Sequence, residues 1–169
     1  MLNMEMILIC ILILILIQQL MIIKGRKKRH QMGHDELTGI CNWEHLVQKA
    51  EKLYKSDRPR YVIYSNIAEF KLINELFGRE KGNEILKKQA ELIRKQAKEG
   101  WLYGRAGEDH FVVIVEPDQF HKKYLYECQE ELQKVLSDSV YNVRIYFGIY
   151  QTERFEESLA SMCDKAALA

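Results

Sequence analysis

The sequence lacks paired cysteines. Its four cysteines are widely spaced, with no CxxC pair and no histidine at metal-ligand spacing. This spacing disfavours a disulfide or zinc framework and favours a reducing compartment. We expect the cysteines to behave as small buried hydrophobic residues. They are Cys10, Cys41, Cys128 and Cys163.

The sequence also lacks an excess of basic over acidic residues, or the reverse. The chain has 25 basic and 24 acidic residues, so nucleic acid is not expected as a partner. The balance hides one basic cluster at residues 24–29, which leaves the rest mildly acidic. Internal repeats are absent, and the roughly 135 residues after the N-terminal thirty or so suit one compact domain with its own core.

Residues 6–23 form an apolar run interrupted only by Gln18 and Gln19. As a helix this run would be about 27 Å long, close to the thickness of a bilayer core. Basic residues follow the run but do not precede it, which predicts a single transmembrane helix with residues 1–5 outside. Residues 24–34 would then be a juxtamembrane linker, and the domain of residues 35–169 would lie in the cytoplasm. The alternative is an N-terminal helix buried in a larger assembly.

Hydrophobic periodicity predicts the elements of the remaining chain. A first helix begins near Asp35 or Thr38 and covers 43–54, and Gly78 ends a second helix. The order predicts an α+β fold of the ferredoxin-like type, an antiparallel sheet with helices on one face. The predicted strands are 61–64, 101–103, 111–115 and 143–150, and the predicted helices are 43–54, 70–77, 85–93, 124–136 and 159–168.

A polar turn at residues 105–111 leads directly into the apolar strand 112–115. The turn carries the carboxylates of Glu108 and Asp109 and the imidazole of His110. Such groups at the edge of a sheet are suited to handling metal ions, phosphate or protons. This turn is therefore the first candidate for a functional site.

Four separated blocks together resemble the GGDEF family, the bacterial diguanylate cyclases. Asp35-Glu36-Leu37-Thr38-Gly39 with Asn42 is similar to the family's DxLTGxxN. Residues 70–82 are similar to FKxINDxxGHxxG, residues 105–111 to RxGGDEF, and residues 163–168 to the ADxAL helix. The resemblance implies the nucleotide-cyclase palm fold and a dimer that joins two GTP molecules into cyclic di-GMP with Mg²⁺ or Mn²⁺.

The resemblance also implies roles for individual residues. The catalytic positions are Glu108, Asp109 and His110. The metal positions are Asn66, Ile67 and Asp109. The nucleotide-binding positions are Phe70, Lys71, Asn74 and Asn83.

Several of these positions depart from the family pattern. Asn66 stands in place of the metal-binding Asp, and Ala68 in place of a second Asp. Asn83 replaces the Asp that binds guanine, His110 the acidic fourth signature letter, and Glu108 the second glycine. The product-inhibition motif RxxD reads Lys-Glu-Gly-Trp here, at residues 98–101.

Two hypotheses follow. In the first, the chain is a degenerate, non-catalytic GGDEF domain that serves regulation or dimerisation and binds GTP weakly, at the bacterial cytoplasmic membrane. In the second, it is an active diguanylate cyclase that uses Glu108 as a substitute metal ligand. Because the chain stops before the family's C-terminal tail, we also expect a longer protein, in which an EAL phosphodiesterase domain follows.

Overall fold

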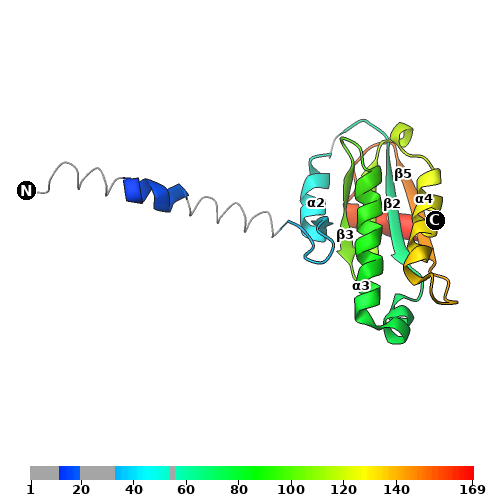
Figure 1. The fold of residues 1–169 in the computed structure, drawn as a ribbon. Helices are drawn as coiled ribbons and strands as arrows, with labels where there is room; N and C mark the ends of the chain where they lie inside the picture. Colours follow the sequence, from blue (N-terminus) through cyan, green and yellow to red (C-terminus); the bar gives the residue numbers. More distant parts are fainter. Residues whose placement is uncertain (1–11, 20–32, 54–55) are drawn as a thin grey trace, which may run out of the picture. The chain divides into compact units, whose positions relative to one another are not determined.

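The computed structural model describes residues 12–19, 33–53 and 56–169. The chain divides into two compact units, residues 1–33 and residues 34–169. The second unit contains the sheet and the helices that cover it (Figure 1).

The predicted membrane location is corrected by the structure. Within the described ranges, no helix is both long enough and apolar enough to cross a bilayer. Of the predicted span 6–23, the structure describes residues 12–19, as a helix, and the rest lies outside the described residues. A single-pass membrane protein is therefore not supported. Residues 1–5 and most of the predicted linker 24–34 also lie outside the described residues.

Five strands form one mixed sheet in the order β1-β3-β4-β2-β5. Strand β1 runs parallel to β3, whereas the β3–β4, β4–β2 and β2–β5 pairs are antiparallel. The predicted antiparallel sheet is thus correct for four strands, and the short β1 adds a parallel edge that hydrophobic periodicity does not reveal. The strands are β1 (Cys41–Asn42), β2 (Arg60–Ile67), β3 (Leu102–Gly107), β4 (His110–Val115) and β5 (Ile145–Thr152).

Helices cover both faces of the sheet, not one face as expected. Alternate side chains of a strand point to opposite faces. In β4, Val113 joins a buried cluster with residues of α3 and α4, while Val112 joins a second cluster with residues of α2 and α5. Figure 1 shows α3 in front of the strands and the red helix α5 behind them. Residues 111–115 of β4 are all apolar because both faces of the strand are buried there.

The predicted helices are confirmed with shifts at their ends, and the predicted helices 70–77 and 85–93 are the two parts of α3 on either side of Gly78. The first predicted helix begins later than expected, at Trp43, where the Asn42 side chain accepts a hydrogen bond from the His45 N–H and so caps the helix. The expected break at Gly78 is confirmed, since its φ of 82° and ψ of 159° interrupt α3. The helices are α2 (Trp43–Glu51), α3 (Phe70–Gln96), α4 (Lys123–Gln133) and α5 (Leu159–Ala167), with 3₁₀ turns at Pro117–Gln119 and Lys134–Leu136.

Close packing at Gly148 fixes the position of α5 on the sheet. A Cβ atom at this position would lie 1.7 Å from the Ala166 carbonyl oxygen, so only glycine permits the approach. Nearby, Cys163 is buried, as are Cys41 and Cys128, and all three are free thiols. The prediction of buried, unpaired cysteines is confirmed for these three.

Candidate active site

The candidate site is a cavity of about 730 Å³ between the end of β2, the start of α3 and the β3–β4 hairpin. Segments far apart in the sequence meet here because β2 and β4 are neighbours in the sheet. The structure brings every predicted site residue except His110 to the lining. The lining residues are Asn66, Ile67, Glu69, Phe70, Lys71, Asn74, Arg79, Asn83, Leu86, Arg105, Glu108 and Asp109.

Asp109 ties the hairpin to the end of β2. Its side chain is buried, with 7 % of the residue exposed. Its Oδ2 accepts a hydrogen bond of 2.8 Å from the backbone N–H of Ile67. One carboxylate oxygen is therefore already engaged within the protein. Such a bond to a charged acceptor is among the stronger protein hydrogen bonds.

His110 lies on the other side of the hairpin. Its ring stacks on Tyr64, with centroids 5.4 Å apart and planes at 26°. Its Nε2 is 3.9 Å from Asp109 Oδ1. Strand alternation puts His110 on the same face as Val112, which belongs to the cluster under α2 and α5. His110 is therefore held beside a tyrosine and does not line the cavity.

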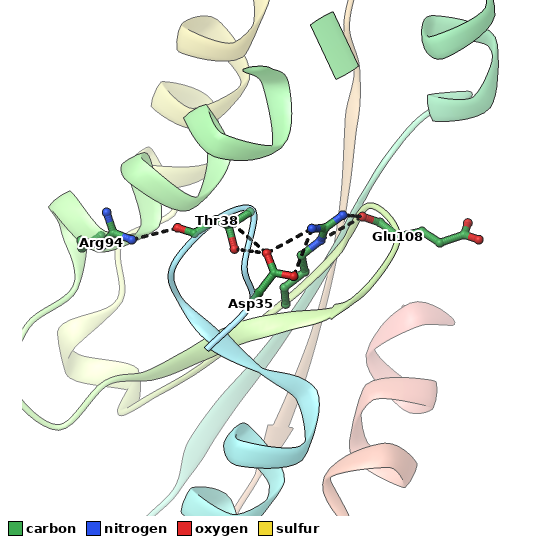
Figure 2. Close-up of polar contacts among 5 residues, drawn as sticks. Asp35, Thr38, Arg94 and Glu108 are labelled. Carbon is green, nitrogen blue, oxygen red and sulfur yellow. Dashed lines mark hydrogen bonds and ion pairs between the residues drawn. The ribbon is translucent and has the colours of Figure 1, made fainter. Parts of the chain in front are cut away.

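Arg105 holds the hairpin and joins it to the loop of residues 34–40. Its Nε donates to the Glu108 carbonyl oxygen at 3.0 Å, and Nη2 donates to the same oxygen. Its Nη1 lies 3.1 and 3.2 Å from the two carboxylate oxygens of Asp35. Figure 2 shows this chain of contacts continuing through Thr38 to Arg94. These contacts give Arg105 a structural role in the hairpin.

The Asp35 carboxylate is adapted to its cationic partner. Burial raises its pKa, but hydrogen bonds from the Thr38 hydroxyl and N–H and from Arg105 outweigh burial. The net effect lowers the pKa of Asp35 below its usual value. The carboxylate therefore stays charged at neutral pH and keeps the loop attached to the hairpin.

Gly82 creates the space for a carboxamide on the wall of the cavity. A Cβ at Gly82 would lie 2.0 Å from Asn74 Oδ1 and 3.2 Å from Phe70 Cζ. The glycine thus lets the Asn74 amide and the Phe70 ring, which belong to the part of α3 before Gly78, pack against the part after it. Asn83 follows directly and lines the same cavity, so two neutral amides are available at this end.

Glu69 connects β2 to α3 in a left-handed conformation, with φ 53° and ψ 37°. This conformation is uncommon for a residue other than glycine and often marks a functional turn. The neighbouring Ala68 N–H donates to the Arg144 carbonyl oxygen at 2.8 Å. Sequence reasoning missed Glu69, because the predicted strand 61–64 ended three residues earlier than β2 does.

The predicted metal positions are by themselves a poor match for Mg²⁺ or Mn²⁺. Both ions favour oxygen ligands, and negative charge on the ligands strengthens the site. Of the predicted metal positions, Asn66 offers a neutral amide and Ile67 only its backbone. Asp109 supplies the one carboxylate, and Ile67 already binds one of its oxygens. These residues alone do not form a strong divalent site.

Comparison with known proteins agrees with the fold. The family model described as "Diguanylate cyclase, GGDEF domain" matches residues 32–169. A diguanylate cyclase of Vibrio cholerae serotype O1 is 27% identical over 118 residues, which are 67% of this chain and 36% of that protein. The cyclic di-GMP phosphodiesterase NbdA of Pseudomonas aeruginosa is 28% identical over 111 residues, 63% of this chain and 14% of that protein. The chain thus spans only a fraction of the length of these relatives.

Solved structures share the fold. The coiled coil and GGDEF domain of DgcB from Caulobacter crescentus, in complex with c-di-GMP, matches with a TM-score of 0.73 and 17% identity, over 96% of this chain and 91% of that one. The active GGEEF domain of a diguanylate cyclase from Vibrio cholerae matches with a TM-score of 0.58 and 21% identity, over 77% and 88%. From the family match over most of its length, the chain belongs to the GGDEF family of diguanylate cyclase domains.

Proposed function

We propose that this chain is a non-catalytic GGDEF domain in cyclic di-GMP signalling, which acts as a regulatory or dimerisation module and binds GTP weakly. The observation that carries the proposal is the pair Asn66 and Asp109 at one cavity. A neutral amide stands beside the only carboxylate of the predicted metal positions. The predicted metal positions therefore supply less negative charge than is needed to hold a divalent cation against a triphosphate.

The other end of the cavity supports weak nucleotide binding. Asn74 and Asn83 both line it and offer neutral hydrogen bonds to a base. Charge-assisted hydrogen bonds are roughly twice as strong as neutral ones. Lys71 lies on the same lining and can attract phosphate. A domain that binds GTP weakly but does not convert it to cyclic di-GMP is suited to regulation by the nucleotide.

The position of His110 further supports the absence of turnover. The ring stacks on Tyr64 and is not part of the cavity lining. A general base has to come within hydrogen-bond reach of the proton that it abstracts. We therefore assign His110 a packing role and not a role in proton transfer.

Glu108 favours a second candidate function, an active diguanylate cyclase. Its side chain is exposed and lines the cavity with Asn66 and Asp109. Arg105 fixes only the backbone carbonyl of Glu108, and the carboxylate extends away from that contact (Figure 2). In this alternative, Glu108 supplies the carboxylate that Asn66 does not. We rank it second because the guanine-binding and fourth-letter positions are changed as well.

The relatives suggest a setting for the domain. Because NbdA carries the name of a cyclic di-GMP phosphodiesterase and matches over only 14% of its length, we propose that this domain works beside a phosphodiesterase domain in a longer protein. In that setting, GTP bound at the cavity would adjust the activity of the neighbour. A homodimer through the GGDEF domain belongs to the same proposal.

Turnover separates the two candidate functions. The full chain is incubated with GTP and Mn²⁺, and the products are separated by chromatography. We expect no cyclic di-GMP above a protein-free control. Steady formation in proportion to protein concentration would refute the non-catalytic proposal. Loss of that product in Glu108→Gln, but not in the exposed control Glu36→Gln, would establish the alternative.

A further inference from the structure

A second cavity lies away from the candidate active site. It has a volume of about 310 Å³. Its lining comes from the two ends of the loop of residues 34–40, from β1, α2 and α3, and from the start of β3. The lining residues are His34, Gly39, Ile40, Cys41, Lys49, Arg94, Trp101, Leu102 and Tyr103. Cavities that bind small molecules start at about 300 Å³. The size is therefore sufficient for a ligand with a single ring.

Two cations on this lining have only neutral partners. Lys49 Nζ lies 3.2 Å from the sulfur of Cys41, and Arg94 Nη2 donates to the Thr38 carbonyl oxygen at 3.0 Å. Within the described part of the chain, neither cation forms an ion pair, and no aspartate or glutamate lines the cavity. The other charged groups of α3 and α2 are outside the lining. The cavity is therefore electropositive.

The protein offsets only part of this charge. Lys49 is in the last turn of α2, where the helix end supplies about half a negative charge. Arg94 likewise lies in the last turn of α3, and the carbonyl oxygen that it contacts is neutral, so part of the positive charge of each side chain is left without a partner. A ligand anion would complete the charge balance and gain charge-assisted hydrogen bonds from both side chains.

Aromatic residues form one wall of the cavity. Tyr103 and Trp101 line it from β3 and the residue before it. The Trp101 N–H is already satisfied by Gln119 Oε1 at 2.8 Å, so the indole offers the ligand an apolar surface. Aromatic side chains favour stacked or edge contacts with other flat rings.

We propose that this cavity binds a small planar organic anion, whose carboxylate or phosphate group contacts Lys49 and Arg94 and whose ring packs against Tyr103. Arg94 also holds the Thr38 carbonyl oxygen, and Thr38 contacts Asp35. Figure 2 shows Arg94 and the hairpin at opposite ends of this chain of contacts. A bound anion thus lies against the loop that anchors Arg105.

Nuclear magnetic resonance tests the proposal with an internal control. The full chain, labelled with ¹⁵N, is titrated with sodium benzoate and separately with phenyl phosphate, against sodium chloride at matched ionic strength. The chain has two tryptophans, and only Trp101 lines this cavity. We expect saturable shifts of the Trp101 indole signal for at least one probe, with the Trp43 signal unchanged.

Matched variants locate the anion. Lys49→Met removes one cation, and Lys52→Met removes a cation one helical turn away that does not line the cavity. We expect Lys49→Met to weaken binding of the better probe about tenfold, the loss of one charged contact, and Lys52→Met to leave it unchanged. Arg94→Lys, which keeps the charge, should retain part of the affinity.

Three results would overturn the proposal. The first is shifts with benzoate and phenyl phosphate no larger than those with chloride. The second is equal weakening by Lys49→Met and Lys52→Met, which would mean diffuse charge and not a site. The third is an affinity for acetate, titrated in the same way, that equals the affinity for benzoate. This result would mean that the aromatic residues do not contribute to binding.

Discussion

The contact between Asp35 and Arg105 is the interaction whose loss we expect to be most informative. Replacing Asp35 by asparagine removes the charge but keeps the size of the side chain. The change weakens four hydrogen bonds, two from Thr38 at 2.9 and 2.6 Å and two from Arg105 at 3.1 and 3.2 Å. The loop of residues 34–40 would then be held to the hairpin by neutral contacts alone.

The size of the effect follows from burial. The side chains of Arg105 and Asp35 are 14% and 22% exposed, so this pair is less screened than a surface ion pair. Exposed pairs contribute up to about 1 kcal/mol, and hydrogen bonds to charged groups about 1.5–3 kcal/mol. We therefore expect Asp35→Asn to lower the free energy of unfolding by about 2 kcal/mol at pH 7. The melting temperature should fall by about 8 °C.

The effect should depend on pH in a defined direction. The pKa of Asp35 is lowered in the folded protein. Its contribution is therefore present above the unfolded value of about 3.9 and is lost as the pH falls through the lower folded value. Wild type and Asp35→Asn should differ fully at pH 6–7 and converge as the solution becomes more acidic than the folded pKa.

Urea denaturation followed by circular dichroism measures both effects, with Glu36→Gln as the control. Glu36 is exposed and adjacent in sequence. We expect the control to change stability by less than about 0.5 kcal/mol. A stability of Asp35→Asn within that same margin of wild type at pH 7 would refute the reasoning.

Three further predictions concern the core and the cavity. Gly148→Ala should destabilise the fold by about 1–3 kcal/mol, because the new Cβ meets the Ala166 carbonyl at 1.7 Å; an unchanged melting temperature would argue against the close approach. The double variant Ser65→Ala with Gln89→Leu should be at least as stable as wild type in urea, because it removes a buried Gln89 Oε1 that has no partner; a loss above about 1 kcal/mol would contradict this. Asn83→Asp should strengthen GTP binding about tenfold by calorimetry, because it restores a charged acceptor; unchanged affinity would remove Asn83 from the site.

Local patterns predicted the elements well because each was governed by nearby residues. Gly78 broke α3 where its sequence context indicated, and the apolar run of β4 marked a buried strand. The expected helix start at Asp35 or Thr38 was wrong for a local reason. The Asp35 side chain bonds the Thr38 N–H and hydroxyl and so closes a turn, a conformation that competes with a helix.

The candidate site was only partly predictable because its defining contacts are long-range. Ile67 and Asp109 are 42 residues apart in sequence, and Asp35 and Arg105 are 70 apart. Hydrophobic periodicity describes only neighbouring residues and does not predict such distant pairs. The side on which His110 lies was accessible in principle, because strand alternation groups it with Val112 and not with Phe111. The face that His110 shares with Val112 is covered by α2 and α5, and on that face the His110 ring stacks on Tyr64.

Manganese binding tests the central claim most directly, namely that Asn66 leaves the cavity without a functional divalent site. The full chain, Asn66→Asp and the exposed control Asn142→Asp are each titrated with Mn²⁺ in calorimetry, with and without GTP. We expect weak binding by wild type and by Asn142→Asp, and affinity at least about tenfold higher for Asn66→Asp, since a second carboxylate joins Asp109. Tight, saturable Mn²⁺ binding by the wild-type chain, unchanged in Asn66→Asp, would contradict the account.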